Sequence, residues 1–344
     1  MRRATWILLM LCIVGASAAT AAQDAPGASE WSVPAYLDSA LNLMQTHSLH
    51  RDEIDWTALR AGALERARTL DSTSRVYPAI RWAIEQLGDH HSWFWTPERV
   101  AEADGPTEPG SLAWYMVARG RRYGRIGYIL VPRFTGALDQ ADRYADSLIA
   151  RIRDLDEEGA CGWIVDVREN SGGNLLPMLA GLRPFLGDGP LVTFEYPDRT
   201  SVIWTYADYL DEARSRYGFH DFRPTQYQLR EPADPVAVLL GPVTASSGEA
   251  VVLAFRGRPV TRSFGYMTQG LTTANEGFRL PDGAMLGLTV AVMADREGGD
   301  AGGGALRAEV VIDDERGFRS HQSPDQDPVL RAALSWLRTL TVCQ

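Results

Sequence analysis

Short hydrophobic runs recur along the chain, and each is followed by a turn and then by a longer apolar segment. Residues 163–167 (WIVDV) form one such run, and residues 236–240 (VAVLL) form another. Runs of this length between turn residues are typical of strands buried on both faces. The segments after the turns, residues 175–182 and 250–255, have the composition of buried helices. Strands that alternate with helices predict an α/β domain.

The same pattern predicts the other elements of this domain. We expect strands at residues 112–118, 127–132, 259–264 and 285–293, and helices at residues 138–155 and from 327 onward. Pro281, Asp282 and Gly283 predict a hairpin turn before the last of these strands. Residues 96–110 are acidic and rich in proline and glycine, so we expect a loop or flap there.

Apolar residues before this domain repeat at helical spacing. They predict three helices, at residues 36–44, at 56–70 and from 78 onward. Gly88 follows the third stripe, where a glycine commonly ends a helix. We therefore predict a small helical cap over residues 30–92, followed by a domain over residues 93–344.

The N-terminus has the pattern of a cleavable export signal. Residues 1–22 carry two arginines directly after Met1, continue through an apolar stretch and end in small residues. The apolar stretch is too short for a lasting membrane span, and no other segment is long enough, so we expect a periplasmic or secreted protein. The two cysteines that remain, Cys161 and Cys343, pair in an oxidising compartment or stay as buried thiols.

Composition and charge exclude several kinds of function. The net charge of -10 argues against a nucleic-acid partner, because phosphate binding needs a basic face. All 34 basic residues are arginine, so every mechanism that uses a lysine is excluded. The histidines lack the spacing of a zinc hydrolase motif, and we expect no metal or other cofactor.

Two turns in the α/β domain carry candidate chemistry. Ser246 lies between the strand at 236–240 and the next helix, at the positive helix end where several hydrolases keep their nucleophile. Ser246 and Glu249 also have the spacing of a capping box, so a structural role is an alternative. Gly172 and Gly173 expose N–H groups that suit an oxyanion, or they serve a turn that needs positive φ.

Four separated segments resemble motifs of the carboxyl-terminal processing (tail-specific) serine protease family. They are LGDHHS at residues 87–92, DVRENSGG at 166–173, TASSGE at 244–249 and GYMTQG at 265–270. Their order matches the family, and the resemblance extends from about residue 36 to the end of the chain. Two features depart from it. Leu271 stands where the family has its lysine, and the stretch between Ser92 and Gly124 is too short for the PDZ domain of many relatives. The chain is therefore similar to the tricorn-like and interphotoreceptor retinoid-binding protein-like branch.

The resemblance implies a Ser-His pair at the centre of the site. Ser246 would be the nucleophile and His91 its general base, with a pKa near the ordinary histidine value of about 6.5. His90 is the second choice for the base. Ser92 is expected to orient the imidazole.

The resemblance also implies the groups around this pair. The oxyanion donors would be the backbone N–H of Ser247 and that of Gly172 or Gly173. The supporting acid is expected at Glu309, with Glu276 and Asp89 as open alternatives. The implied fold is a crotonase-like stack of ββα units behind the helical cap.

These features together predict an exported serine peptidase that hydrolyses peptide bonds through an acyl-enzyme. Its substrate would be a peptide or protein, and it would need no cofactor. The alternative is a non-catalytic protein of the same fold that carries an apolar ligand. The aromatic-rich segment at residues 187–231 suits such a carrier, or it is plain packing.

Overall fold

The computed structural model describes residues 32–70, 72–104, 113, 116–136, 140–217, 222–299, 303–318, 320 and 323–344. The expected signal at residues 1–22 lies outside the described residues. The chain forms two compact units. The first contains the described part of residues 1–105 together with Tyr196–Arg199 and Thr273–Ala291, and the second contains the rest.

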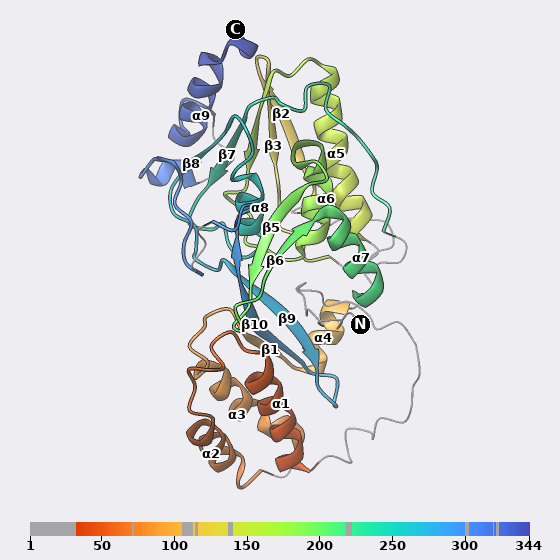
Figure 1. Ribbon diagram of the computed structural model, residues 1–344, viewed down its shortest axis with the longest axis vertical. Helices are drawn as coiled ribbons and strands as arrows, with labels where there is room; N and C mark the ends of the chain where they lie inside the picture. The colour runs from red at the N-terminus through yellow and green to blue at the C-terminus, as the bar shows by residue number, and fades with distance from the viewer. Residues whose placement is uncertain are drawn as a thin grey trace, which may run out of the picture. The chain divides into compact units, whose positions relative to one another are not determined.

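The first unit combines helices with a hairpin from late in the chain. Helices α1 (Val33–His47), α2 (Trp56–Ala67) and α3 (Thr73–Glu85) pack on one another, and strands β9 (Thr273–Arg279) and β10 (Met285–Ala294) form the hairpin (Figure 1). Strand β1 (Trp93–Trp95) pairs antiparallel with the start of β10. The turn at residues 281–283 is confirmed.

One carboxylate fastens the hairpin turn to the helices. Asp282 accepts hydrogen bonds from the hydroxyl groups of Tyr36 at 2.8 Å and Tyr77 at 2.7 Å. Burial and the neighbouring Asp282 raise the pKa of both tyrosines, which keeps them protonated as donors. Tyr36 is itself fully buried in the apolar stripe of α1, as its helical spacing predicts.

Two predictions in this region are wrong. Helix α3 begins at Thr73 rather than at Pro78, because Val76 extends the buried stripe by one more turn and this packing tolerates a proline inside the helix. Residues 97–104 of the expected loop form helix α4 (Pro97–Asp104). Its first residue is a proline, which favours a helix start, and Val100 is buried.

The second unit is built on a six-stranded sheet. The strand order is β11-β8-β7-β4-β3-β2, and all neighbours are parallel except β2 and β3. Their bounds are Arg119–Tyr123 (β2), Ile126–Leu130 (β3), Gly162–Asp166 (β4), Val236–Leu240 (β7), Thr261–Gly265 (β8) and Val310–Val311 (β11). The expected strand at 112–118 is not found in its described part, since the strand begins at Arg119.

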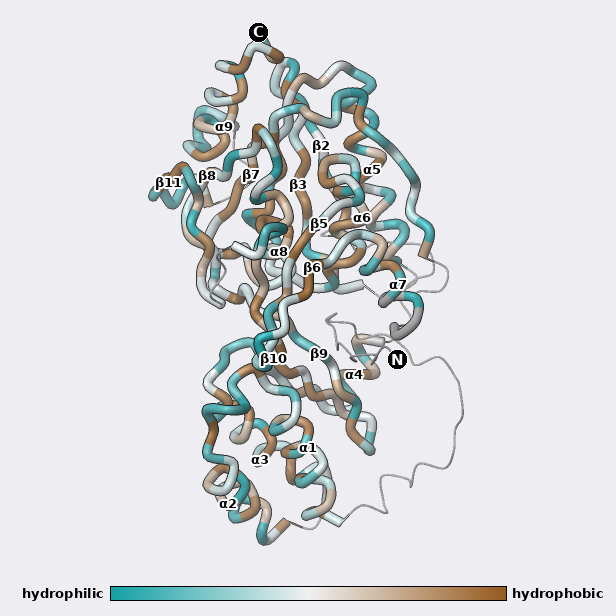
Figure 2. The backbone as a smooth tube through the Cα atoms, viewed as in Figure 1, coloured by the Kyte–Doolittle hydropathy of each residue, from teal (hydrophilic) through white to brown (hydrophobic). Residues whose placement is uncertain are grey.

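Helices cover both faces of this sheet. Helices α5 (Ala141–Glu157), α6 (Leu175–Leu186) and α8 (Ser247–Phe255) lie on one side, and α9 (Pro328–Thr339) lies on the other (Figure 1). Hydrophobic residues are concentrated on the central strands, as Figure 2 shows for β3 and β7. Every residue of β3, β4 and β7 is buried, as expected for parallel strands between two helical layers. The predicted α/β class is confirmed.

The aromatic-rich middle segment is largely packed into this unit. It forms strands β5 (Pro190–Glu195) and β6 (Ser201–Thr205) and helix α7 (Tyr206–Tyr217). Phe194, Trp204 and Tyr209 are buried and contact one another through their rings. These aromatics therefore serve as core packing.

Two features anchor the C-terminal helix. Cys161 and Cys343 form a disulfide, so of the two states open to them they adopt the paired one. Asp327 caps the first turn of α9 by accepting a hydrogen bond from Leu330 N–H, and it forms an ion pair with Arg168. Among the described residues, no helix has the length and apolar character needed to cross a membrane.

Candidate active site

The sheet brings the two candidate turns to the same edge. Asp166 at the end of β4 pairs with Leu239 near the end of β7. The segments that follow lead into α6 and α8, so both turns begin at the carboxyl ends of adjacent parallel strands. This edge is where open α/β sheets bind their ligands.

Ser246 has a strained backbone. It has φ 53° and ψ -121°, in the region that residues with a side chain rarely adopt. The residue stands immediately before α8 and is half-buried. A serine on a sharp, strained turn from a strand to a helix is the arrangement called a nucleophile elbow. Such strain usually marks a functional position.

The glycine turn lies directly against this serine. A Cβ atom on Gly172 would be 2.8 Å from the Ser246 Cβ, and a Cβ on Gly173 would collide with the backbone carbonyl of Phe134. Both glycines have positive φ, of 97° and 114°. The turn therefore requires glycine for steric reasons, and the role in oxyanion binding stays a prediction.

Hydrogen bonds distinguish the expected oxyanion donors. The N–H of Gly172 donates to Asn170 Oδ1 at 2.9 Å and is therefore already used. Within the described residues, no hydrogen bond is found from the N–H of Gly173 or of Ser247. The hydroxyl of Ser247 donates to the carbonyl oxygen of Gly173 at 2.5 Å, and Ser247 is only 8% exposed. Ser247 thus resembles a structural residue, in contrast to Ser246.

The histidine motif forms a tight turn after α3. Gly88 has φ 77° and ends the helical region, as predicted. Asp89 Oδ1 then accepts hydrogen bonds from the backbone N–H of His91 at 2.9 Å and of Ser92 at 2.6 Å. His90 is exposed and His91 is half-buried. Only His91 is therefore held in a defined environment.

The ring of His91 is held by strand β9. Its Nδ1 lies 2.8 Å from Thr273 Oγ1, and its carbonyl oxygen accepts a hydrogen bond from Asn275 Nδ2 at 2.7 Å. Burial lowers the pKa of His91 to about 4, against the opposing effect of Asp89. The imidazole is thus neutral near pH 7, rather than half-titrated near 6.5 as we expected.

The expected supporting residues have other partners. Ser92 Oγ donates to Asp89 Oδ2 at 2.8 Å and accepts from Thr289 N–H at 3.0 Å, so it stabilises the turn. Glu276 is buried on β9, on the face opposite to Thr273 because successive strand residues alternate. The His91 ring contacts the hydroxyl of Thr273, and the roles of Glu276 and Asp89 as supporting acid stay predictions. Thr273 lies three residues beyond the GYMTQG segment, and none of the four motifs predicts its contact with His91.

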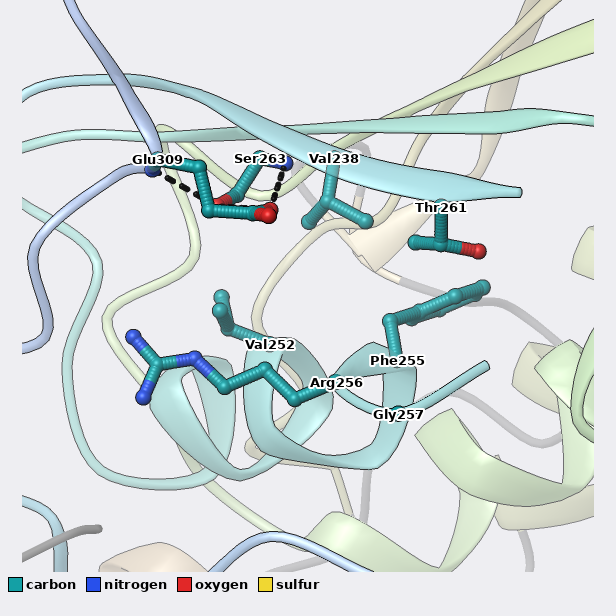
Figure 3. Close-up of a pocket in the computed structure, with 8 residues that line it drawn as sticks. All are labelled: Val238, Val252, Phe255, Arg256, Gly257, Thr261, Ser263 and Glu309. Atoms are coloured by element: carbon teal, nitrogen blue, oxygen red, sulfur yellow. Dashed lines mark hydrogen bonds between the residues drawn. The ribbon is translucent and has the colours of Figure 1, made fainter. Parts of the chain in front are cut away.

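Glu309 lies beside a cavity of about 230 Å³ between the C-terminal half of α8 and strands β7 and β8 (Figure 3). Its Oε2 accepts hydrogen bonds from the backbone N–H and the hydroxyl of Ser263, at 2.7 and 3.0 Å. Val252 and Phe255 of α8 form the apolar side of the cavity. None of the hydrogen bonds found for Glu309 in the described residues joins it to Ser246 or His91. Its role as supporting acid stays a prediction.

Comparisons with known proteins identify a peptidase family. A family model described as peptidase family S41 matches residues 125–310. The nisin-resistance protein of Lactococcus lactis subsp. lactis is 30% identical over 261 residues, which are 76% of this chain and 77% of that protein.

Solved structures show the same fold. A lipoprotein from Streptococcus agalactiae has a TM-score of 0.73 at 23% identity, over 90% of this chain and 97% of that one. The photosystem II D1 C-terminal processing protease has a TM-score of 0.58 at 16% identity, over 88% and 97%. The chain belongs to peptidase family S41, and the resemblance to the carboxyl-terminal processing proteases is confirmed.

Proposed function

We propose that this protein is an exported serine peptidase in which Ser246 attacks the peptide bond and His91 acts as the general base. The observation that carries the proposal is the strained backbone of Ser246 at the start of α8, against the glycine turn. Membership of a peptidase family supports it. We further propose that the fold is a crotonase-like stack of ββα units with a helical cap.

The chemistry follows from the groups around each residue. Because Nδ1 of His91 is engaged with Thr273, Nε2 is the nitrogen that accepts the proton of the Ser246 hydroxyl. The serine oxygen then bonds to the substrate carbonyl carbon, and the N–H groups of Ser247 and Gly173 stabilise the resulting oxyanion. His91 returns the proton to the leaving amine, and water hydrolyses the acyl-enzyme in the same way.

The substrate class is proposed to be peptides. One relative is named for resistance to nisin, and nisin is therefore among the substrates to be tested. The alternative, an apolar-ligand carrier, loses support because Phe194, Trp204 and Tyr209 pack against one another in the core.

Export is supported by the N-terminal sequence and by the disulfide between Cys161 and Cys343, a bond that persists in oxidising compartments. We expect the mature N-terminus to lie between Ala18 and Gln23, where the small residues end. N-terminal sequencing of the protein recovered outside the cytoplasm measures this directly. An intact Met1 in that fraction would contradict the proposal.

The pH dependence of activity tests the role of His91. We expect kcat/KM for a peptide ester to stay level through neutral pH and to fall as the pH drops through about 4, because the lowered pKa keeps His91 neutral above that value. The change His91→Ala should abolish turnover, and His50→Ala, at an exposed ion pair with Glu53, is the matched control. Equal losses from the two changes in folded protein would refute the role of His91.

A further inference from the structure

We propose that Glu249 is the positioning residue of this site: it holds the nucleophile backbone in its strained geometry and ties the segment at residues 268–271 to it. The inference rests on the proposed role of Ser246. The positioning role is additional to the helix cap that the spacing of Ser246 and Glu249 predicts.

The carboxylate of Glu249 accepts four hydrogen bonds. Its Oε2 accepts from the backbone N–H of Ser246 and of Leu271, each at 2.8 Å. Its Oε1 accepts from the hydroxyl of Thr268 at 2.5 Å and from the N–H of Gly270 at 2.9 Å. The side chain is fully buried, with 0% exposure. The carboxylate therefore joins the serine turn to residues 268–271: Oε2 bonds to both, and Oε1 bonds only to the later segment.

These contacts suit an ionised carboxylate. Burial raises the pKa of Glu249, while the hydrogen bonds from Thr268, Gly270, Ser246 and Leu271 oppose that rise. Within the described residues, no arginine or histidine forms an ion pair with it. Backbone donors and the positive end of α8 stabilise the charge instead. An ionised carboxylate has acceptors only, which matches the four groups that donate hydrogen bonds to it.

A plain capping box does not account for this arrangement. In a capping box the glutamate side chain bonds only to the N–H of the cap residue, here Ser246. Glu249 accepts three more hydrogen bonds, from residues that follow β8. A residue with positive φ keeps that conformation only where its surroundings hold it, and Glu249 bonds to the N–H of that very residue. The segment it holds ends at Leu271, two residues before Thr273, which contacts the His91 ring. One buried carboxylate thus restrains both the nucleophile and the chain leading to the histidine's partner.

The change Glu249→Gln tests the proposal because it keeps the shape and removes one acceptor. In one orientation, the amide NH₂ would face the N–H groups of Ser246 and Leu271, and in the other that of Gly270. A donor would then face a donor in either case. We expect the rate of fluorophosphonate labelling per folded molecule and kcat to fall by about 100-fold, with KM unchanged, as a small misplacement of the nucleophile does.

Glu249→Asp should recover part of the rate, because both oxygens still accept. Asp295→Asn is the matched control, since Asp295 also accepts from two backbone N–H groups but in an exposed turn away from Ser246. Folding of each variant is checked by circular dichroism. If Glu249→Gln does not fold, Glu249→Asp is measured instead, and a wild-type rate for it would overturn the proposal.

The possible outcomes distinguish a failure of the positioning role of Glu249 from a failure of the proposed function. If the unchanged protein is not labelled at all, the proposed function fails. If the unchanged protein is labelled and Glu249→Gln is labelled at the same rate per folded molecule, the function stands and the positioning role is wrong. A loss of folded protein at an unchanged rate would likewise show that Glu249 only stabilises the fold.

Discussion

Replacement of Ser246 by alanine is expected to lower kcat to near background, by on the order of 10³-fold or more, as loss of a nucleophile does. The bond between residue 246 N–H and Glu249 does not need the serine side chain, so the turn remains held. The free energy of unfolding should change by at most about 1 kcal/mol, the usual cost of losing a cap. Steady-state hydrolysis of a peptide ester and urea unfolding measure the two effects.

The neighbouring serine supplies the control. Ser247→Ala removes the hydrogen bond from the hydroxyl to the carbonyl oxygen of Gly173 but keeps the backbone N–H. We therefore expect most of the activity to remain and the stability to fall by about 1 kcal/mol. If Ser247→Ala abolishes activity and Ser246→Ala does not, the nucleophile is one residue further along the turn.

Replacement of Arg168 by methionine is expected to lower the free energy of unfolding by about 3 to 5 kcal/mol. Arg168, Asp166 and Asp327 are all fully buried, and the guanidinium lies 2.6 Å from Asp166 and 2.8 Å from Asp327. Burial alone would lower the pKa of Arg168, but Asp166 and Asp327 raise this pKa above its ordinary value. Methionine would leave both carboxylates buried without their cation.

An exposed ion pair serves as the comparison for this change. Arg122 lies 3.0 Å from Glu158, and their side chains are 35% and 54% exposed. Arg122→Met should therefore cost less than about 1 kcal/mol. Urea unfolding of both variants, with the disulfide intact, measures the difference. Equal destabilisation by the two changes would mean that the buried cluster does not anchor α9.

Elements whose sequence pattern is local could be predicted closely. Strand β7 occupies the predicted residues, because five apolar residues stand directly before Gly241-Pro242. The hairpin turn at 281–283 and the start of α9 after Asp327 have equally local signals. Helix α4 was not predicted, because the proline and glycine content of residues 96–110 is typical of a loop.

Contacts between distant residues could not be predicted in the same way. Thr273 lies 182 positions from His91 in the sequence, and a lone threonine in a strand carries no pattern that indicates a histidine partner. The lowered pKa of His91 likewise depends on burial, which the motif does not show. The spacing of Ser246 and Glu249 predicted a cap, yet only the fold reveals the bonds to Thr268, Gly270 and Leu271.

Labelling with a fluorophosphonate, followed by mass-spectrometric mapping, shows directly whether Ser246 is the nucleophile. We expect one covalent adduct, on the peptide that contains Ser246, formed in folded protein and lost in Ser246→Ala. Mapping must resolve Ser246 from Ser247, because both lie on the same turn. An adduct on Ser247, or no adduct in folded protein, would show that Ser246 is not the nucleophile.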